Sequence, residues 1–287
     1  MDTQRGIDPR VSVIVPAFNE ARNLEKILPT LPEVHEVIVV DGGSTDGTAE
    51  TARRALPGVR VVTQTRDGKG NAMACGFGQA TGDILVMFDG DGSADAREIP
   101  LMVAALVNGA DFVKGSRMLH GGGSADLTFT RSLGNMALTR LVNMLFRTRY
   151  TDLCYGYNAF WRDVLDEFDL PDWTLTGEPR WGDGFEIETL LNCRAAAARL
   201  TILELPSYEH GRLHGVSNLR AYHDGMRVLR TIRAEWRRVR TLRQATRHLD
   251  QQARWSERTP AGGEGRARAL DRSGAPLRDS GEGRDDR

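Results

Sequence analysis

Lysine, cysteine and long apolar segments are all scarce in this sequence. No run of about 18 apolar residues occurs among its 287 residues, and residues 1–10 lack the apolar stretch of a signal peptide. The three cysteines, Cys75, Cys154 and Cys193, are odd in number and lack metal-ligand spacing, which indicates a reducing compartment rather than a disulfide framework. We therefore expect a cytoplasmic protein without a membrane span.

An excess of charge of either sign is also missing. The sequence contains 38 Lys and Arg residues against 39 Asp and Glu residues, a formal net charge of −1. A general nucleic-acid-binding protein would carry a basic excess, so no nucleic-acid partner is expected. Because lysine occurs only at Lys26, Lys69 and Lys114, nearly all of the positive charge is arginine.

Short apolar runs alternate with helix-forming segments in units of about 25 residues, which predicts a right-handed βαβ arrangement. Most of these runs are continuous, as in strands that are buried on both faces of a parallel sheet. The sequence thus predicts an α/β fold with a mostly parallel central sheet flanked by helices. The predicted strands are residues 11–15, 36–40, 59–63, 84–88, 111–114, 155–161 and 200–205.

Composition divides the chain into an N-terminal extension (1–9), a main domain (10–216), a basic amphipathic helix (217–249) and a tail (250–287). The tail has almost no apolar residues and should be disordered. In the basic helix, apolar residues recur every three or four positions with arginines between them. Such a helix lies on an anionic bilayer or packs on its own domain, and the pattern is compatible with both.

Two carboxylates follow the predicted strand 84–88. Asp89 and Asp91 flank a glycine where the strand gives way to a loop. In open α/β sheets the ligand crevice lies at the carboxyl ends of the strands, so the pair is placed where a substrate would bind. A bound cation relieves the repulsion between close carboxylates, and Mg²⁺ or Mn²⁺ accepts one or two of them together with phosphate oxygens. We interpret the pair as a metal and diphosphate site; the alternative is a polar Asp-Gly turn.

Polar residues also follow other predicted strands. Asn19 and Glu20 come after the first strand, and Asp41 ends the second one before a glycine-rich turn. Asp41 is placed to accept hydrogen bonds from a nucleobase or ribose, whereas Asn19 and Asp46 could instead cap helices. Lys69, between two glycines at a helix start, could reach a phosphate or remain a solvated loop lysine. The dinucleotide-binding spacing G-x-G-x-x-G is absent from the sequence.

Taken together, these motifs resemble those of the inverting glycosyltransferases of family 2, most closely the dolichyl- or polyprenyl-phosphate sugar synthases. The likeness covers about residues 10 to 235 and departs from the pattern at Gly42, where relatives often have a second acid, and at Gly92-Ser93. Membrane helices that often follow in lipid-linked relatives are replaced by the arginine-rich helix. The matching segments are residues 13–20, 39–48, 68–70, 80–83, 89–91, 115–117 and 211–219.

The resemblance implies a GT-A type, Rossmann-like fold for the nucleotide-sugar domain, and it assigns roles to individual residues. Asp89, Asp91 and Arg117 would be catalytic, and the two acids would hold Mg²⁺ or Mn²⁺. The nucleotide sugar would be bound by Pro16, Asn19, Glu20, Asp41, Asp46, Lys69 and Asp89. The acceptor would be bound by Arg117, Arg131, Asn135 and Arg212.

The implied reaction moves a hexose, with inversion, from a GDP-mannose or UDP-glucose type donor to a polyprenyl or dolichyl phosphate. A phosphate monoester is already anionic at pH 7, so it needs little help from a base. The predicted partners are therefore the donor, a lipid phosphate and the cytoplasmic face of an anionic membrane.

A soluble family 2 enzyme acting on a small phosphorylated or hydroxyl acceptor, such as phosphoglycerate, is the alternative. A hydroxyl acceptor would require a base, for which Asp183, Glu186 and Glu188 are candidates, although acids in this position more often stabilise a helix N-terminus. Two alternatives come from other functional classes of protein: a nucleotidyltransferase and a non-enzymatic protein that binds nucleotide sugars. The donor base and the third metal ligand stay open.

Overall fold

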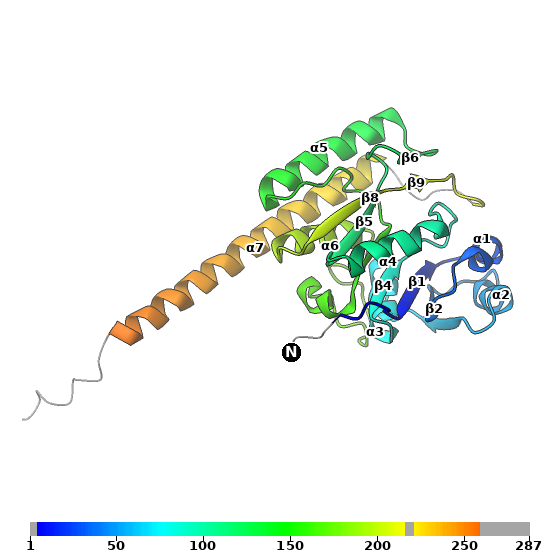
Figure 1. Ribbon diagram of the computed structural model, residues 1–287, viewed down its shortest axis with the longest axis horizontal. Coiled ribbons are helices and arrows are strands. Elements are labelled where there is room, and N and C mark those ends of the chain that lie inside the picture. Colours follow the sequence, from blue (N-terminus) through cyan, green and yellow to red (C-terminus); the bar gives the residue numbers. More distant parts are fainter. Residues whose placement is uncertain (1–4, 216–220, 259–287) are drawn as a thin grey trace, which may run out of the picture. The chain divides into compact units, whose positions relative to one another are not determined.

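A seven-stranded sheet runs through the protein (Figure 1) in the order β3-β2-β1-β4-β7-β5-β8. The computed structural model describes residues 5–215 and 221–258. The seven strands are β1 (Val11–Ala17), β2 (Glu36–Asp41), β3 (Arg60–Thr63), β4 (Ile84–Met87), β5 (Phe112–Ser116), β7 (Asn158–Trp161) and β8 (Ile202–Pro206). A separate two-stranded sheet pairs β6 (Gly123–Ser124) with β9 (Tyr208–Glu209).

Helices flank the central sheet. Helix α3 packs against β1, β2 and β3, and α4 packs against β5 and β7. The helices are α1 (Ala21–Ile27), α2 (Thr48–Ala55), α3 (Lys69–Gln79), α4 (Ile99–Val107), α5 (Phe129–Phe146), α6 (Ile187–Ala197) and α7 (Ala221–Arg258), with 3-10 turns η1 (Leu28–Thr30), η2 (Ala96–Glu98) and η3 (Arg162–Phe168). The predicted α/β fold with a mostly parallel sheet is confirmed. Only β7 is antiparallel to its neighbours, β4 and β5.

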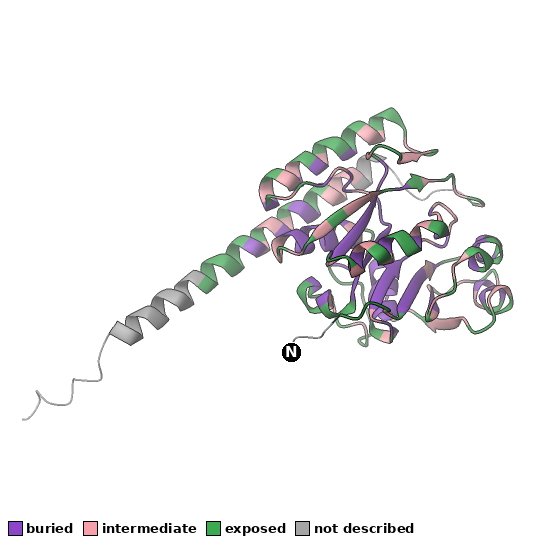
Figure 2. Cartoon of the chain, in the orientation of Figure 1, coloured by how far each residue is buried: buried purple, intermediate pink, exposed green. Residues whose placement is uncertain are grey.

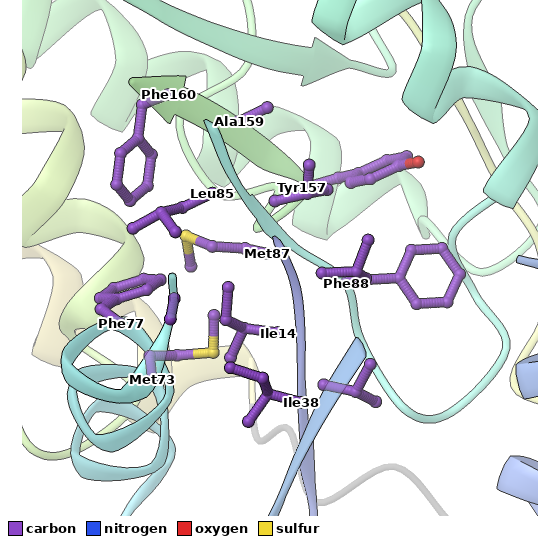
Figure 3. Close-up of a cluster of buried hydrophobic side chains, with 14 of the residues drawn as sticks. Ile14, Ile38, Met73, Phe77, Leu85, Met87, Phe88, Tyr157, Ala159 and Phe160 are labelled. Atoms are coloured by element: carbon purple, nitrogen blue, oxygen red, sulfur yellow. The ribbon is translucent and has the colours of Figure 1, made fainter. Parts of the chain in front are cut away.

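The core lies along β1 and β4, whose apolar runs are buried on both faces (Figure 2). Figure 3 shows Met73 and Phe77 of α3 beside Ile14 and Leu85 of these strands. Phe88, which directly follows β4, is buried and packs edge to face on Tyr157 with ring centroids 5.8 Å apart. Burial of Phe88 therefore fixes the end of β4 just before Asp89.

The first part of α7 belongs to the main domain, which corrects the predicted boundary at residue 216. One compact unit extends to Val239. Ile232 and Val239 are buried in an apolar cluster with Val142 and Phe146 of α5 and with residues of α6. Of the two readings of the basic helix, packing on its own domain therefore describes the positions of Ile232 and Val239.

A buried ion pair fastens α7 to α6. Glu235 is 1% exposed and accepts hydrogen bonds from the Arg194 guanidinium at 2.8 and 3.0 Å, as well as one from the Trp181 indole at 3.2 Å. Arg194 also donates to the carbonyl oxygens of Phe168 and Asp169. Since buried ions are stable only when paired and hydrogen-bonded, this network holds the part of α7 around Glu235 on the domain.

Helix α7 ends at Arg258, past the predicted end at residue 249, so residues 250–258 are helical and not part of a disordered tail. The predicted disorder of residues 259–287 lies outside the described residues. The N-terminal extension is tied to the domain from Arg5, which pairs with Asp111 at 2.5 Å and Asp163 at 3.0 Å. None of the helices in the described ranges is both long enough and apolar enough to cross a membrane.

Removing the Glu235 carboxylate should destabilise the domain. We expect Glu235→Ala to lower the free energy of unfolding by about 3 to 5 kcal/mol, because it leaves the Arg194 charge buried without a partner. The exposed Arg233 on the same helix provides the control: Arg233→Ala should change stability by less than about 0.5 kcal/mol. Urea unfolding of both variants checks this, and equal effects would contradict the assigned anchoring role.

Candidate active site

A cavity of about 910 Å³ opens at the carboxyl edge of the central sheet. Its wall includes residues at or just after the ends of β1, β2, β4 and β5, the starts of α3 and α6, one side of α5 and the segment after β9. Such an edge is where open α/β sheets bind ligands. Predicted site residues in the wall are Pro16, Glu20, Lys69, Asp89, Asp91, Arg117, Arg131, Asn135 and Arg212.

Lys69 lies between two carboxylates at the inner end of the cavity. Its ammonium nitrogen is 2.7 Å from Asp89 and 2.5 Å from Glu188. Desolvation lowers the pKa of Lys69, but the charges of these two acids outweigh it and raise the pKa. Lys69 is therefore a fixed cation, and the reading of a solvated loop lysine is wrong.

The surroundings of Asp89 raise the pKa of its carboxyl group. Desolvation raises its pKa to about 6, with further upward contributions from Glu188 and Asp91, although Lys69 acts in the opposite direction. An additional cation near Asp89 would favour its ionised form.

The segment after β9 contacts Asp91, the second acid of the pair. Arg212 pairs with Asp91 at 3.3 Å and also with Glu20. Backbone hydrogen bonds hold this contact in place: the amide of His210 donates to the carbonyl of Ser93, and the amide of Leu213 donates to the carbonyl of Asp91. Desolvation raises the pKa of Glu20 even though Arg212 lowers it. The structure therefore places Arg212 beside the acidic loop and not with Arg117.

The turn that carries Lys69 is pressed against another backbone segment. A Cβ atom on Gly68 or Gly70 would overlap the carbonyl groups of Gly182 and Asp183, so only glycine fits at these two positions. The Asp183 carboxylate is held by buried Arg66 at 2.6 and 2.9 Å. This contact explains why two glycines flank the lysine and brings the start of α6 to the site.

Arg117 also lines the cavity and is held by two acids. Its guanidinium donates hydrogen bonds to Asp152 at 2.7 and 2.9 Å and to Glu209 at 3.0 Å. It also lies over the Tyr155 ring, with its central carbon 4.9 Å from the ring centroid. Burial would raise the pKa of Asp152, but the hydrogen bonds and charge of Arg117 lower it. Asn135 donates to the same carboxylate at 2.9 Å. Arg117 is therefore rigid, with Asn135 as part of its support.

Arg131 is held less tightly than Arg117. It donates to the Asp126 side chain at 3.4 Å and to the Asp126 backbone carbonyl at 3.5 Å. These long contacts with a largely exposed acid leave its guanidinium able to reorient toward a ligand. Arg131 and Arg117 thus bring two guanidinium groups to the cavity wall, each beside an acid, Asp126 or Glu209, that lines the same cavity.

Three predicted nucleotide-binding residues hold loops together instead of lining the cavity. The Asn19 side chain accepts from the Thr45 amide at 2.9 Å, and Asp46 accepts from the amides of Ala21 and Thr48 at 3.0 and 3.1 Å. Asp41 accepts from the Ser44 amide. Asn19, Asp41 and Asp46 are not among the described residues of the cavity wall. Their contact with a nucleotide stays a prediction.

Of the three candidate bases for a hydroxyl acceptor, only Glu188 faces the cavity. Asp183 is occupied by Arg66, and Glu186 accepts hydrogen bonds from the amides of Gly182 and Gly184. Sequence reasoning did not anticipate that Glu188 pairs with Lys69, nor that Asp152 and Glu209 hold Arg117. The acids clustered at residues 183–188 were the only signal for the first of these contacts.

The residues present fit a small divalent cation bound together with a ligand. Across the described residues, no group of three or more His, Cys, Asp and Glu side chains has the geometry of a complete metal site. Asp89 and Asp91 nevertheless place two carboxylates in a wall that is rich in negative charge. Mg²⁺ and Mn²⁺ suit such an incomplete set, since they take one or two carboxylates and complete their shell with water and phosphate oxygens.

An α/β sheet with paired acids and a glycine-flanked lysine at its carboxyl edge is the arrangement expected of an enzyme that handles a nucleoside diphosphate. Comparison with known proteins defines the class further. Residues 12–168 match the family described as Glycosyl transferase family 2. The chain therefore belongs to this family, and the resemblance noted in the sequence is confirmed.

Individual relatives agree with this membership. Glycosyltransferase AglJ of Haloferax volcanii is 31% identical over 223 residues, which cover 75% of this chain and 68% of that protein. Undecaprenyl-phosphate mannosyltransferase of Micrococcus luteus is 33% identical, covering 69% of this chain and 82% of that protein.

A solved structure shows the same fold. It is glucosyl-3-phosphoglycerate synthase from Mycobacterium tuberculosis in complex with Mn²⁺, uridine diphosphate and phosphoglyceric acid, with a TM-score of 0.60 and 24% identity. The match covers 79% of this chain and 78% of that one. The expected GT-A type fold is thereby confirmed.

Replacing Asp91 should separate ligand binding from folding. We expect Asp91→Asn to weaken binding of a nucleoside diphosphate in the presence of Mn²⁺ by on the order of 1.5 to 3 kcal/mol, since the amide lacks the charge of the carboxylate. The melting temperature should stay within a few degrees of the wild-type value, because the Arg212 pair is partly exposed. Calorimetric titration measures the first quantity and thermal unfolding the second.

Asp166→Asn is the control, because Asp166 is an exposed carboxylate that does not line the cavity. It should bind the diphosphate as the wild type does. Equal binding by Asp91→Asn and the wild type would remove Asp91 from the metal and diphosphate site.

Proposed function

We propose that this family 2 glycosyltransferase transfers a hexose, with inversion, from a nucleoside diphosphate sugar to a polyprenyl phosphate. The observation that carries the proposal is that one cavity contains a group of acids, Asp89, Asp91 and Glu188, together with two arginines, Arg117 and Arg131. The acids suit a diphosphate bound with a cation, and the arginines suit a separate phosphate. A relative named for undecaprenyl phosphate supports the choice of acceptor.

On the donor side, the protein must stabilise the negative charge that develops on the leaving diphosphate. Asp89 and Asp91 would hold a divalent cation, which when bound neutralises part of this charge. Lys69 lies beside Asp89 and Glu188 and supplies a fixed positive charge close to Asp89, where the diphosphate would bind. Because its partners already orient it, little reorganisation is needed as the bond breaks.

On the acceptor side, an oxygen of the lipid phosphate is the nucleophile. It forms a bond to the anomeric carbon as the bond from that carbon to the diphosphate oxygen breaks, and the nucleoside diphosphate leaves. The phosphate oxygen is already anionic, so no proton has to be removed. Arg117 and Arg131 bring the two polyanions together and orient the attacking oxygen. Glu188 needs no role as a base in this reaction.

A panel of donors and acceptors tests the proposal. Purified protein is incubated with Mn²⁺ or Mg²⁺, each of GDP-mannose and UDP-glucose, and either undecaprenyl phosphate or 3-phosphoglycerate. If the sugar of the donor is labelled, the proposal predicts that one of the two donors gives a labelled product with undecaprenyl phosphate and that this product partitions into organic solvent. Turnover of 3-phosphoglycerate alone would overturn it and favour the small-acceptor alternative, in which Glu188, the only candidate base that faces the cavity, would act on a hydroxyl group.

Replacing Arg131 should distinguish an effect on acceptor binding from an effect on donor binding. We expect Arg131→Ala to weaken acceptor binding by on the order of 1.5 to 3 kcal/mol through loss of a charge-assisted hydrogen bond, with donor KM unchanged. Fold should be retained because Arg131 makes only weak contacts. Exposed Arg233→Ala serves as the charge-matched control. A rise in donor KM equal to the rise in acceptor KM would contradict the assignment of Arg131 to the acceptor.

A further inference from the structure

Helix α5 is apolar on two opposite faces. One face packs inward through Val142 and Phe146. On the other face, Phe129, Leu133, Met136 and Met144 are 83%, 53%, 39% and 70% exposed. Spacings of four, three and eight residues bring these four side chains to one side of a helix, which we call the outer face of α5. Figure 2 shows exposed segments along the length of this helix.

An aligned row of large exposed apolar side chains is unusual for a soluble surface. Single exposed apolar residues are common and need no explanation, but a contiguous set marks an interaction site. Helix α7 does not supply the cover along its buried part, because Ile232 and Val239 pack on the inner side of α5. The outer face therefore calls for a partner of its own.

The charges on α5 are all positive. Residues 129–146 contain Arg131 and Arg140 but no Asp or Glu, and Arg147 and Arg149 follow. Arg140 is exposed and, at helical spacing, falls among the four apolar residues of the outer face. Apolar side chains interspersed only with arginines suit an anionic bilayer, in which the rings and methionines enter the interface and the arginines meet the headgroups.

A second copy of the chain fits this face less well. A two-fold contact between two outer faces would bring Arg140 of each copy near the other's cationic helix, with no carboxylate on α5 to offset the repulsion. A bilayer surface has no such conflict. The charge pattern therefore favours lipid over self-association.

Helix α5 also lines the active site, on its other side. Thr130, Arg131, Gly134, Asn135 and Leu138 line the cavity, and at helical spacing they lie largely opposite the outer face. Because a helix with its side chains is about 10 to 12 Å across, a bilayer against the outer face would lie within about one helix diameter of the cavity.

We propose that the outer face of α5 docks the enzyme on an anionic lipid bilayer, which brings the cavity on the other side of the same helix close to the membrane surface. This inference rests on the proposed function for its biological purpose, but the surface itself is defined by exposure and charge. It moves the membrane contact from the basic helix α7, where the sequence pattern suggested it, to a helix whose outward side chains are free of packing within the described domain.

Sedimentation with vesicles tests the surface. Wild-type protein should bind vesicles of mixed phosphatidylglycerol and phosphatidylcholine more strongly than vesicles of phosphatidylcholine alone. The double variant Phe129→Ser with Leu133→Ser should lower the partition coefficient by about tenfold or more, because it removes two large side chains from the buried contact. Arg140→Glu should abolish the preference for phosphatidylglycerol.

Leu101→Ser is the matched control, since Leu101 is 62% exposed on α4 and should bind vesicles as the wild type does. Unchanged melting temperatures show that all variants fold. Loss of binding confined to the α5 variants supports the proposal. Vesicle binding by the double variant at the wild-type level, absence of wild-type binding at low salt, or a wild-type dimer that the double variant dissociates would each overturn it.

Activity separates this inference from the proposed function. With a short-chain, water-soluble polyprenyl phosphate, the double variant should turn over at the wild-type rate, whereas with undecaprenyl phosphate in vesicles it should be slower. If no polyprenyl phosphate is used but vesicle binding still depends on α5, the docking surface stands and the proposed function fails. If lipid phosphates are used but binding ignores α5, the docking surface fails alone.

Discussion

Like-charged carboxylates crowd one edge of the central sheet, and the geometry of the site follows from how their repulsion is offset. Lys69 bridges Asp89 and Glu188, and Arg212 bridges Asp91 and Glu20. Each cation reaches the acids from a different part of the chain, so the acidic loop fixes the α3 turn and the segment after β9 at the same time. Desolvation raises the pKa of Asp89, with smaller contributions from Glu188 and Asp91, and a cation arriving with the diphosphate would favour its ionised form.

Around Arg117 the arrangement is the reverse: two acids hold one cation in place. Arg117 is fixed by Asp152 and Glu209, and Asn135 supports Asp152 from α5. Paired in this way, a largely buried guanidinium keeps its charge and its orientation. Arg131 is held weakly by comparison and can adapt to a ligand. One rigid and one adaptable cation in the same cavity as the group of acids is consistent with bringing two polyanions together.

Local sequence patterns were sufficient to predict the mostly parallel sheet and the place of the acidic pair just after β4, because each depends on a few neighbouring residues, whereas several strand ends differ by two or three residues. They could not show that β7 runs antiparallel, since an apolar run carries no direction. Nor could they show the partners of Lys69 and Arg117, which come from distant segments. Asn19 and Asp46 illustrate the reverse problem: the same side chains suit a ligand or a loop, and here they bond to backbone amides.

The two long helices show a further limit of periodicity. A stripe at helical spacing predicts that a face will be covered but not by what, so the basic pattern of α7 was compatible with membrane and with packing. The structure buries Ile232 and Val239 of that stripe and leaves Leu229 and Leu242 exposed. In α5, apolar residues on both faces weaken the amphipathic signal, and only the exposed Phe129 and Met144 reveal its outward side.

Product analysis tests the central claim most directly. After incubation with an α-linked nucleoside diphosphate sugar, a divalent cation and polyprenyl phosphate, the products are separated and the anomeric configuration is determined by nuclear magnetic resonance. The account predicts free nucleoside diphosphate and one β-linked hexosyl phosphate lipid in equal amounts. Release of pyrophosphate, retention of the α configuration, or free hexose without a lipid product would contradict direct displacement by the acceptor phosphate.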